Sequence, residues 1–268
     1  MEFDCKGRTV FAYTGGRRFD PGLPTLVFIH GGANDHSVWA LQSRYFAHHG
    51  FGVLAVDLPG HGRTPGPALP TVEELGQWIV EVVDTLGVGG CALAGHSMGS
   101  LVAMEAAARL GARARQLALV GSTFPMRVSA ELLEAARDNE PLAHRMIVGW
   151  SVSSYAQYPG NPGPGAWVRG GNLRLLQRQR PGVLHTDFNA CNAYSRGLEC
   201  AAAVSCPVLL LLATTDVMTP VRGGRAFARS FRDARVVEIP GSGHALMAEA
   251  PDAVLDGLRD FFVASPGR

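Results

Sequence analysis

The chain has 268 residues, of which 47% are hydrophobic, and a formal net charge of +1. A chain of this length can bury a large core, and its size is in the range of one domain with an insertion. The near-zero charge gives no electrostatic argument for binding nucleic acid or an anionic membrane surface, and no apolar run approaches the length needed to span a bilayer.

The first 121 residues alternate strand-like apolar runs with helical stretches. Strands are expected at residues 10–13, 25–29, 52–56, 91–94 and 116–120, and a helix with a continuous apolar face at 72–86. The alternation resumes near residue 207, with strands at 207–212 and 235–239 and a helix at 222–231. This pattern predicts an α/β fold in which helices flank a mostly parallel central sheet.

The segment between these two halves has a different pattern. Residues 122–205 contain helical stretches at 130–138, 142–150 and 173–180, an irregular stretch rich in proline and glycine at 158–165, and no strand-like run. We therefore interpret residues 1–121 and 206–268 as one core, and residues 122–205 as a helical cap inserted into it. Such a cap would limit the size of a substrate and exclude water from it.

Residues 95–99 read Gly-His-Ser-Met-Gly and follow an apolar run. In a sharp strand–turn–helix, the positions two before and two after the serine pass so close that a side chain would clash. Gly95 and Gly99 supply the room. The turn would lift the Ser97 hydroxyl off the sheet edge and aim the backbone N–H of Met98 at the same point. Ser97 is therefore a candidate nucleophile.

The partners that a serine nucleophile needs follow later in the chain. Asp216 comes just after the apolar run at 207–212, and His244 lies in the loop after the strand at 235–239. The carboxyl ends of parallel strands share one edge of a sheet, where ligands bind, so we expect Ser97, Asp216 and His244 at that edge. In this arrangement His244 takes the proton of Ser97, and Asp216 orients His244.

Five motifs in one order carry a resemblance to a known family. They are residues 26–32 (Leu-Val-Phe-Ile-His-Gly-Gly), 57–62 (Asp-Leu-Pro-Gly-His-Gly), 95–99, the turn at 216–220, and 241–244 (Gly-Ser-Gly-His) followed by Glu249 and Pro251. With these motifs the chain resembles the α/β-hydrolase-fold serine hydrolases throughout its length, apart from the central segment. The resemblance implies a Ser-His-Asp hydrolase in which the backbone N–H of Gly32 completes the oxyanion hole with that of Met98.

The reaction expected from these groups is hydrolysis of a carboxylic ester or related carbonyl compound through an acyl-enzyme. Lactone opening, thioester cleavage and carbon–carbon bond hydrolysis use the same triad and stay open. A ligand-binding sensor that retains a slow triad is a further alternative. The residues also fit ordinary structural roles: Ser97 as a helix N-cap, Asp216 as a turn residue and His244 as a loop histidine.

We expect neither a metal nor a cofactor. No histidines or cysteines have the spacing of a zinc site, and the glycine-rich loops match neither the dinucleotide-binding nor the P-loop pattern. We interpret His30 as ordering the oxyanion loop, His61 as a turn residue and His96 as the variable residue of the serine turn. The expected partner is a small carbonyl substrate, and the oligomeric state is left open.

Large apolar residues near the expected site are candidates for lining a pocket, although core packing competes with substrate contact at each. These candidates are Trp39, Met126, Trp150, Trp167 and Met218. Arg174, Arg178 and Arg180 come nearest to a cluster that would bind an anionic substrate, but we interpret them as a solvated helix face.

Five cysteines, an odd number without a C-x-x-C pair, favour reduced, partly buried thiols. The N-terminal residues lack the basic and apolar regions of a secretory signal. We therefore expect a cytoplasmic protein.

Overall fold

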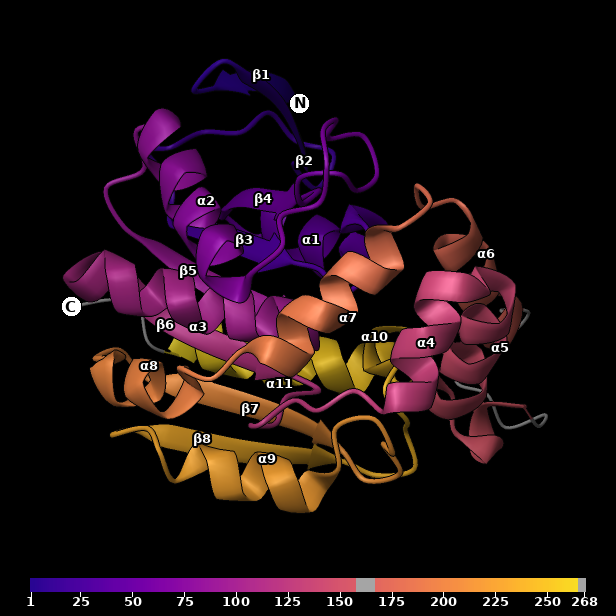
Figure 1. Ribbon diagram of the computed structural model, residues 1–268. Helices are drawn as coiled ribbons and strands as arrows, with labels where there is room; N and C mark the ends of the chain where they lie inside the picture. The colour runs from indigo at the N-terminus through magenta and orange to yellow at the C-terminus, as the bar shows by residue number, and fades with distance from the viewer. Residues whose placement is uncertain (158–166, 265–268) are drawn as a thin grey trace.

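The computed structural model describes residues 1–157 and 167–264, and in these residues eight strands form one sheet (Figure 1). The strands are β1 (Glu2–Cys5), β2 (Arg8–Tyr13), β3 (Thr25–Ile29), β4 (Gly52–Val56), β5 (Cys91–His96), β6 (Ala114–Val120), β7 (Val208–Ala213) and β8 (Ala234–Ile239). Their order is β1-β2-β4-β3-β5-β6-β7-β8. β1 pairs antiparallel with β2, and β2 pairs antiparallel with β4. All the other neighbouring pairs, from β4 through β3, β5, β6 and β7 to β8, are parallel. The predicted α/β fold with a mostly parallel sheet is confirmed.

Helices cover both faces of this sheet (Figure 1). They are α1 (Ala40–Ala47), α2 (Val72–Thr85), α3 (Met98–Leu110), α4 (Ala130–Asp138), α5 (Glu140–Ser151), α6 (Val168–Gln177), α7 (Val183–Ala193), α8 (Gly197–Ala203), α9 (Val221–Ala228), α10 (Leu246–Glu249) and α11 (Pro251–Ala264). The short 3-10 helices are η1 (His36–Trp39), η2 (Gly111–Arg113) and η3 (Ser154–Gln157). One face of the sheet packs against α2, α3 and α9, and the other packs against α1 and α11.

Burial on both faces explains the unbroken apolar runs of the central strands. In β3, Val27 and Ile29 belong to the core cluster on the α2–α3 side, whereas Leu26 and Phe28 belong to the cluster on the α1–α11 side. Successive side chains of a strand point to opposite faces, so a strand covered on both sides has no solvent-facing position for a polar residue.

The N-terminal hairpin is a feature that the sequence analysis did not predict. β1 and β2 pair antiparallel across a two-residue turn at Lys6 and Gly7, both of which have positive φ (53° and 78°). Two residues with positive φ form the tight turn that suits the twist of a hairpin. The hairpin adds β1 as the edge strand of the sheet.

Five α-helices, the 3-10 helix η3 and no strand occupy the described part of the chain between β6 and β7. Buried residues of α4, α5, α6 and α7 form a cluster of their own, which also includes Ala33 of the loop after β3. Figure 1 shows α4, α5 and α6 beyond the end of the sheet toward which the arrow of β7 points. By contrast, Ala190 and Cys191 at the end of α7, and Cys200 and Ala201 of α8, belong to the main core cluster. The irregular stretch predicted at 158–165 lies outside the described residues.

All five cysteines are buried and free. Among the helices of the described residues, none combines the length and the apolar character that crossing a membrane requires.

Candidate active site

Ser97 is the single residue between β5 and α3, and its φ is positive (51°, with ψ −122°). This conformation is unfavourable for a residue with a side chain and costs on the order of 1–3 kcal/mol. A Cβ added at Gly95 would overlap the carbonyl oxygen of Gly99, and one added at Gly99 would overlap that of His30. The two glycines therefore have the steric role that the motif predicted, and the strained turn presents the Ser97 side chain at the carboxyl end of β5.

The side chains of Ser97, His244 and Asp216 form a continuous hydrogen-bonded chain. His244 Nε2 lies 2.9 Å from Ser97 Oγ, and His244 Nδ1 lies 2.7 Å from Asp216 Oδ2. With the Nδ1 proton directed at the carboxylate, Nε2 is left to accept the Ser97 hydroxyl proton. Ser97 thus meets two residues that lie more than a hundred positions later in the sequence, at the sheet edge where we expected them.

The turn after β7 fixes Asp216. Its Oδ1 accepts from the backbone N–H of Met218 and of Thr219, each at 2.8 Å, and its Oδ2 accepts from the Thr219 hydroxyl at 2.6 Å. Burial alone would raise the pKa of this carboxyl, but the attraction to His244 and the hydrogen bonds outweigh burial and hold the pKa well below 3.8. Asp216 is therefore a carboxylate near neutral pH.

The loop that carries His244 is bound to the helical segment between β6 and β7. Glu249 accepts from Gly243 N–H at 3.1 Å through one carboxylate oxygen and from Ser153 N–H at 2.9 Å through the other. Ala245 N–H also donates to the carbonyl of Ser151 at 2.9 Å. Glu249 followed the predicted histidine motif, and the structure gives it this linking role.

The backbone N–H groups of Gly32 and Met98 have no hydrogen-bond partner in the described residues. Gly32 follows β3 and lines the same two cavities as Ser97, and Met98 begins α3 and lines one of them. Two such N–H groups near one hydroxyl are the donors that an oxyanion hole requires.

Two cavities meet at Ser97, and Gly32, Phe188 and Met218 line both of them. The larger has a volume of about 580 Å³ and includes polar residues such as Asn34 and Arg174. The smaller, of about 350 Å³, is lined mostly by apolar side chains.

The predicted pocket residues divide between these cavities and the core. Trp167 lines the larger cavity with 78% of its surface exposed, Met126 and Trp150 line the smaller one, and Met218 lines both. Trp39 lines neither cavity: it is fully buried and packs against Phe28 in the core cluster on the α1–α11 face of the sheet. Its position in η1 turns it toward that core, which is a correction to its expected place near the substrate.

Arg174, Arg178 and Arg180 do not form the solvated helix face that we predicted. Arg178 donates two hydrogen bonds to the Asp35 carboxylate, at 2.8 and 2.7 Å. Arg180 donates to the carbonyls of Gly60 and Thr64 at 2.6 and 3.1 Å. Both side chains therefore bind the loops that follow β3 and β4, and Arg174 lines the larger cavity.

The ring of His96 is buried beside the ring of His244, with centroids 4.8 Å apart. Burial, followed by the charge of His244, lowers the pKa of His96 to about 3, so this ring is neutral. Its Nε2 lies 2.9 Å from the carbonyl oxygen of His244 and can donate to it. His96 thus supports the His244 loop.

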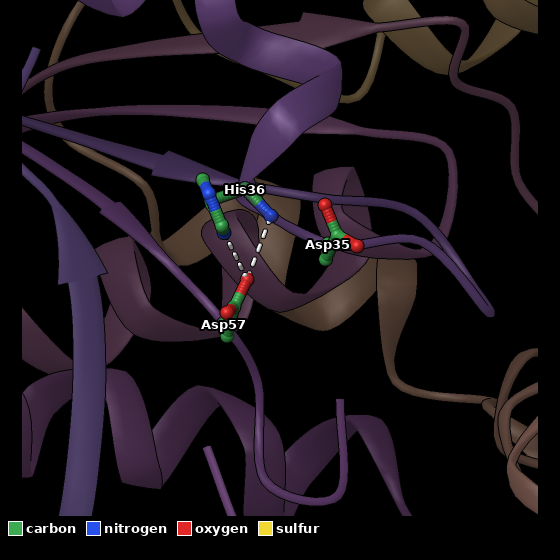
Figure 2. A group of neighbouring side chains, drawn as sticks. All are labelled: Asp35, His36 and Asp57. Carbon is green, nitrogen blue, oxygen red and sulfur yellow. Dashed lines mark hydrogen bonds and ion pairs between the residues drawn. The ribbon is translucent and has the colours of Figure 1, made fainter. Parts of the chain in front are cut away.

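Asp35, His36 and Asp57 lie close enough together to suggest a metal site (Figure 2). One oxygen of Asp57 accepts from the backbone N–H of His36 at 2.7 Å and faces His36 Nδ1 at 2.8 Å, while the other accepts from Arg63 N–H at 2.8 Å. Asp35 is bound by Arg178. Because protein donors already bind both carboxylates, we interpret the group as a structural network.

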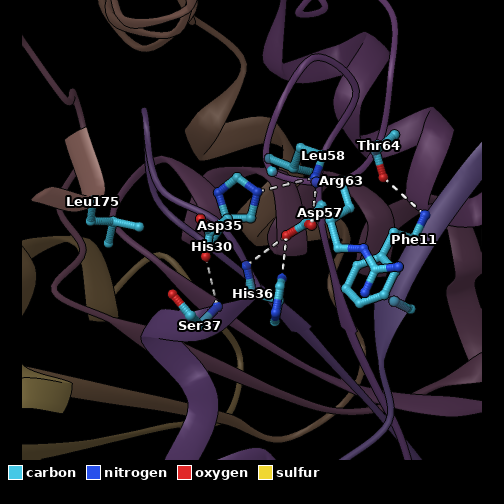
Figure 3. A network of polar contacts seen from close by, with 12 residues as sticks. Phe11, His30, Asp35, His36, Ser37, Asp57, Leu58, Arg63, Thr64 and Leu175 are labelled. Atoms are coloured by element: carbon cyan, nitrogen blue, oxygen red, sulfur yellow. Dashed lines mark hydrogen bonds and ion pairs between the residues drawn. The ribbon is translucent and has the colours of Figure 1, made fainter. Parts of the chain in front are cut away.

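That network joins the loop after β3 to the turn after β4 (Figure 3). His30 Nε2 accepts from Leu58 N–H at 3.0 Å, and its Nδ1 lies 2.8 Å from the Gly31 carbonyl. Asp57, beside Leu58, binds His36 in the segment that follows the loop. His30 therefore links the loop after β3 to the turn after β4, and its role in an oxyanion loop stays a prediction.

His61 and Asp187 form a buried pair that the sequence analysis missed. His61 Nε2 lies 2.8 Å from Asp187 Oδ2, and both side chains are almost fully buried. The partners are 126 residues apart. Local sequence signals identified His61 only as a turn residue and gave no reason to single out Asp187.

Comparison with known proteins identifies the class to which this fold and site belong. The model of the alpha/beta hydrolase family matches residues 26–256, so the chain belongs to that family and is a hydrolytic enzyme of this class. It is 22% identical over 247 residues to (E)-2-((N-methylformamido)methylene)succinate hydrolase of Acinetobacter baylyi, covering 90% of this chain and 91% of that protein.

Two further comparisons give the same class. The chain is 30% identical over 261 residues to pimeloyl-[acyl-carrier protein] methyl ester esterase of Neisseria meningitidis, covering 88% of this chain and 92% of that protein. Among solved structures, an enol-lactonase from Burkholderia xenovorans superimposes with a TM-score of 0.85 at 23% identity and covers 98% of this chain and 100% of its own. At this identity the superposition shows a shared fold.

Proposed function

We propose that the protein hydrolyses carboxylic esters through an acyl-enzyme, with Ser97 as nucleophile, His244 as general base and acid, and Asp216 as the residue that orients His244. The observation that carries this proposal is the chain of contacts from Asp216 to His244 to Ser97, at 2.7 and 2.9 Å. A relative named as a methyl ester esterase, 30% identical over 88% of this chain, supports the ester as substrate class.

In the first half of the reaction, His244 Nε2 takes the Ser97 proton while Oγ attacks the ester carbonyl carbon. The N–H groups of Gly32 and Met98 stabilise the negative oxygen that forms, and the Asp216 carboxylate stabilises the imidazolium. His244 then gives its proton to the departing alcohol. In the second half, His244 removes a proton from water while the water oxygen attacks the acyl carbon. His244 then gives this proton to Ser97 Oγ as the carboxylic acid departs, which regenerates the serine.

We also propose that helices α4–α7 form a cap over this site. Their cluster is separate from the sheet's core clusters, and Phe188 of α7 and Ile147 of α5 line the cavities beside Ser97. One cavity would take the acyl group and the other the alcohol. A cap of this kind selects substrates by size and keeps water away from the intermediate.

A panel of p-nitrophenyl esters, lactones and thioesters tests the proposal. We expect repeated turnover of at least one ester class, loss of turnover in Ser97→Ala with an unchanged circular dichroism spectrum, and labelling of Ser97 by a fluorophosphonate. Turnover of only lactones or thioesters would move the reaction to one of those bonds. Catalysis limited to one event per bound ligand would favour a sensor, and full activity of Ser97→Ala would place the nucleophile elsewhere.

A further inference from the structure

The carboxylate of Asp187, on α7, lies against the oxyanion loop. Its Oδ2 accepts from the backbone N–H of Ala33 at 2.7 Å, and the residue is fully buried. Ala33 directly follows Gly32, and a Cβ added to Gly32 would lie 3.3 Å from the Cβ of Asp187. A side chain of the helical segment thus touches the backbone next to the proposed oxyanion donor.

Ala33 needs such a partner because its backbone is strained. Its φ is +50°, a region that residues with a Cβ rarely adopt. A strained conformation persists only where surrounding contacts hold it. The Asp187 carboxylate binds the N–H of Ala33, and the N–H of Asn34 donates to the Gly31 carbonyl at 3.3 Å. The bond to Asp187 holds the Gly32–Ala33 peptide, and the bond from Asn34 holds the preceding peptide, which contains the Gly31 carbonyl and the Gly32 N–H. Together they fix the direction of the Gly32 N–H.

His61 supplies the charge that Asp187 requires. Its Nδ1 lies 3.0 Å from the carbonyl oxygen of Pro59, and its Nε2 lies 2.8 Å from Asp187 Oδ2. Both partners are acceptors, so both ring nitrogens carry protons and the ring is an imidazolium. Burial lowers the pKa of His61, but the attraction of Asp187 and the hydrogen bonds outweigh burial and leave the pKa above 6.5.

The other titratable groups near the His61 ring are Asp57 and His30, from the loops of the sheet domain. Asp57 adds to the attraction for a positive ring. His30 adds no charge, because burial and the neighbouring His61 lower its pKa to about 4. The surroundings therefore favour a positive charge on the His61 ring.

We propose that Asp187 is a positioning residue for the oxyanion hole: it holds the Gly32–Ala33 peptide so that the Gly32 N–H points at the reacting oxygen. The positive ring of His61 compensates the charge of the Asp187 carboxylate, so this carboxylate does not repel the oxyanion. This inference rests on the proposed function, because it assigns Asp187 to the same oxyanion hole. It also makes the hole depend on the helical segment between β6 and β7.

A graded pair of variants tests the kinetic consequence. Asp187→Ala removes the acceptor, and we expect kcat to fall by about 100-fold, the scale of losing one oxyanion donor, with KM changed little. Asp187→Asn keeps an acceptor oxygen but loses the charge, and we expect a smaller fall of about tenfold. Asn189→Ala is the matched control, because Asn189 is exposed on the same helix and bonds only to His185 in the described residues. Unchanged kcat in Asp187→Ala, or a loss confined to KM, overturns the inference.

Two readouts do not depend on turnover and separate this inference from the proposed function. In ¹⁵N spectra of histidine recorded through a pH titration, with His61 assigned through His61→Gln, we expect the ring to lose its proton above the ordinary histidine pKa of 6.5. A ring that is already neutral at that pH overturns the inference, even where the Asp187 variants fail to fold. In a crystal structure of folded Asp187→Ala we expect Ala33 to leave the positive-φ region, and an unmoved Gly32–Ala33 backbone is the contrary result. If no ester is hydrolysed by the unaltered protein, the proposed function fails while these readouts still decide on Asp187.

Discussion

Asp216→Asn is the substitution whose effect follows most directly from the site's hydrogen bonds. The asparagine oxygen can replace Oδ1 and keep the bonds from the Met218 and Thr219 N–H groups, so the turn should persist. Its NH₂ group then takes the place of Oδ2, 2.7 Å from His244 Nδ1. Because NH₂ donates, Nδ1 becomes the acceptor and the ring proton moves to Nε2, where it faces Ser97.

A histidine in that tautomer cannot accept the serine proton, and it also lacks the carboxylate that stabilises its charged form. In a comparable triad this exchange lowers kcat by about 10⁴, which at 1.36 kcal/mol for each tenfold step is about 5.4 kcal/mol of lost transition-state stabilisation. We expect a loss of that size in Asp216→Asn, with an unchanged circular dichroism spectrum. Initial rates on the best ester of the panel measure the loss.

Asp233→Asn is the control for this experiment, since Asp233 is an exposed residue in the loop between α9 and β8. It should leave both the rate and the stability unchanged. A rate within tenfold of normal for correctly folded Asp216→Asn would refute the role of Asp216 and would direct the search to another carboxylate.

Three further outcomes are expected. Gly99→Ala should lower the free energy of unfolding by about 3 kcal/mol or more, because the added Cβ meets the carbonyl oxygen of His30. In the control Gly149→Ala the Cβ meets nothing within 4 Å, so the free energy of unfolding should not fall. Urea unfolding measures both variants. The His96 ring should stay neutral in NMR titrations down to about pH 4, since its pKa is about 3; protonation near pH 6 contradicts this. The depressed pKa of Asp216 gives stability that is complete above its unfolded pKa near 3.8 and is lost as pH falls through the lower folded value. The stability difference between the unaltered protein and Asp216→Asn should therefore shrink below about pH 4, and a constant difference argues against it.

The parts of the molecule that the sequence predicted are governed by local rules. The strands at 25–29 and 52–56 match β3 and β4 because both faces of these strands are covered, and every position is apolar except the buried Thr25. The steric role of Gly95 and Gly99 was predictable because the constraint lies within one turn of five residues. The sheet edge at which Ser97, Asp216 and His244 meet follows from the parallel topology.

The parts that were missed depend on distant contacts or on weak local signals. Nothing around Asp187 marks it, because its role comes from His61 and Ala33, which lie more than a hundred residues away. Arg178 resembles a solvated residue until Asp35 is placed beside it. The hairpin turn at Lys6 and Gly7 had a local signal, a glycine in a two-residue connection, but the flanking strands are short and half exposed.

The helical segment and the proposed chemistry are joined at two points on either side of Ser97. On one side the Glu249 carboxylate binds Ser153 N–H and Gly243 N–H, next to His244. On the other side Asp187 binds Ala33 N–H, next to Gly32. In both places a buried carboxylate holds backbone N–H groups, and such groups are costly to leave unpaired, so a shift of the helices moves the attached loops with them. A substitution that loosens the packing among α4, α5 and α7 should therefore displace both His244 and the Gly32 N–H, and so lower kcat. It should also change the shape of the cavities.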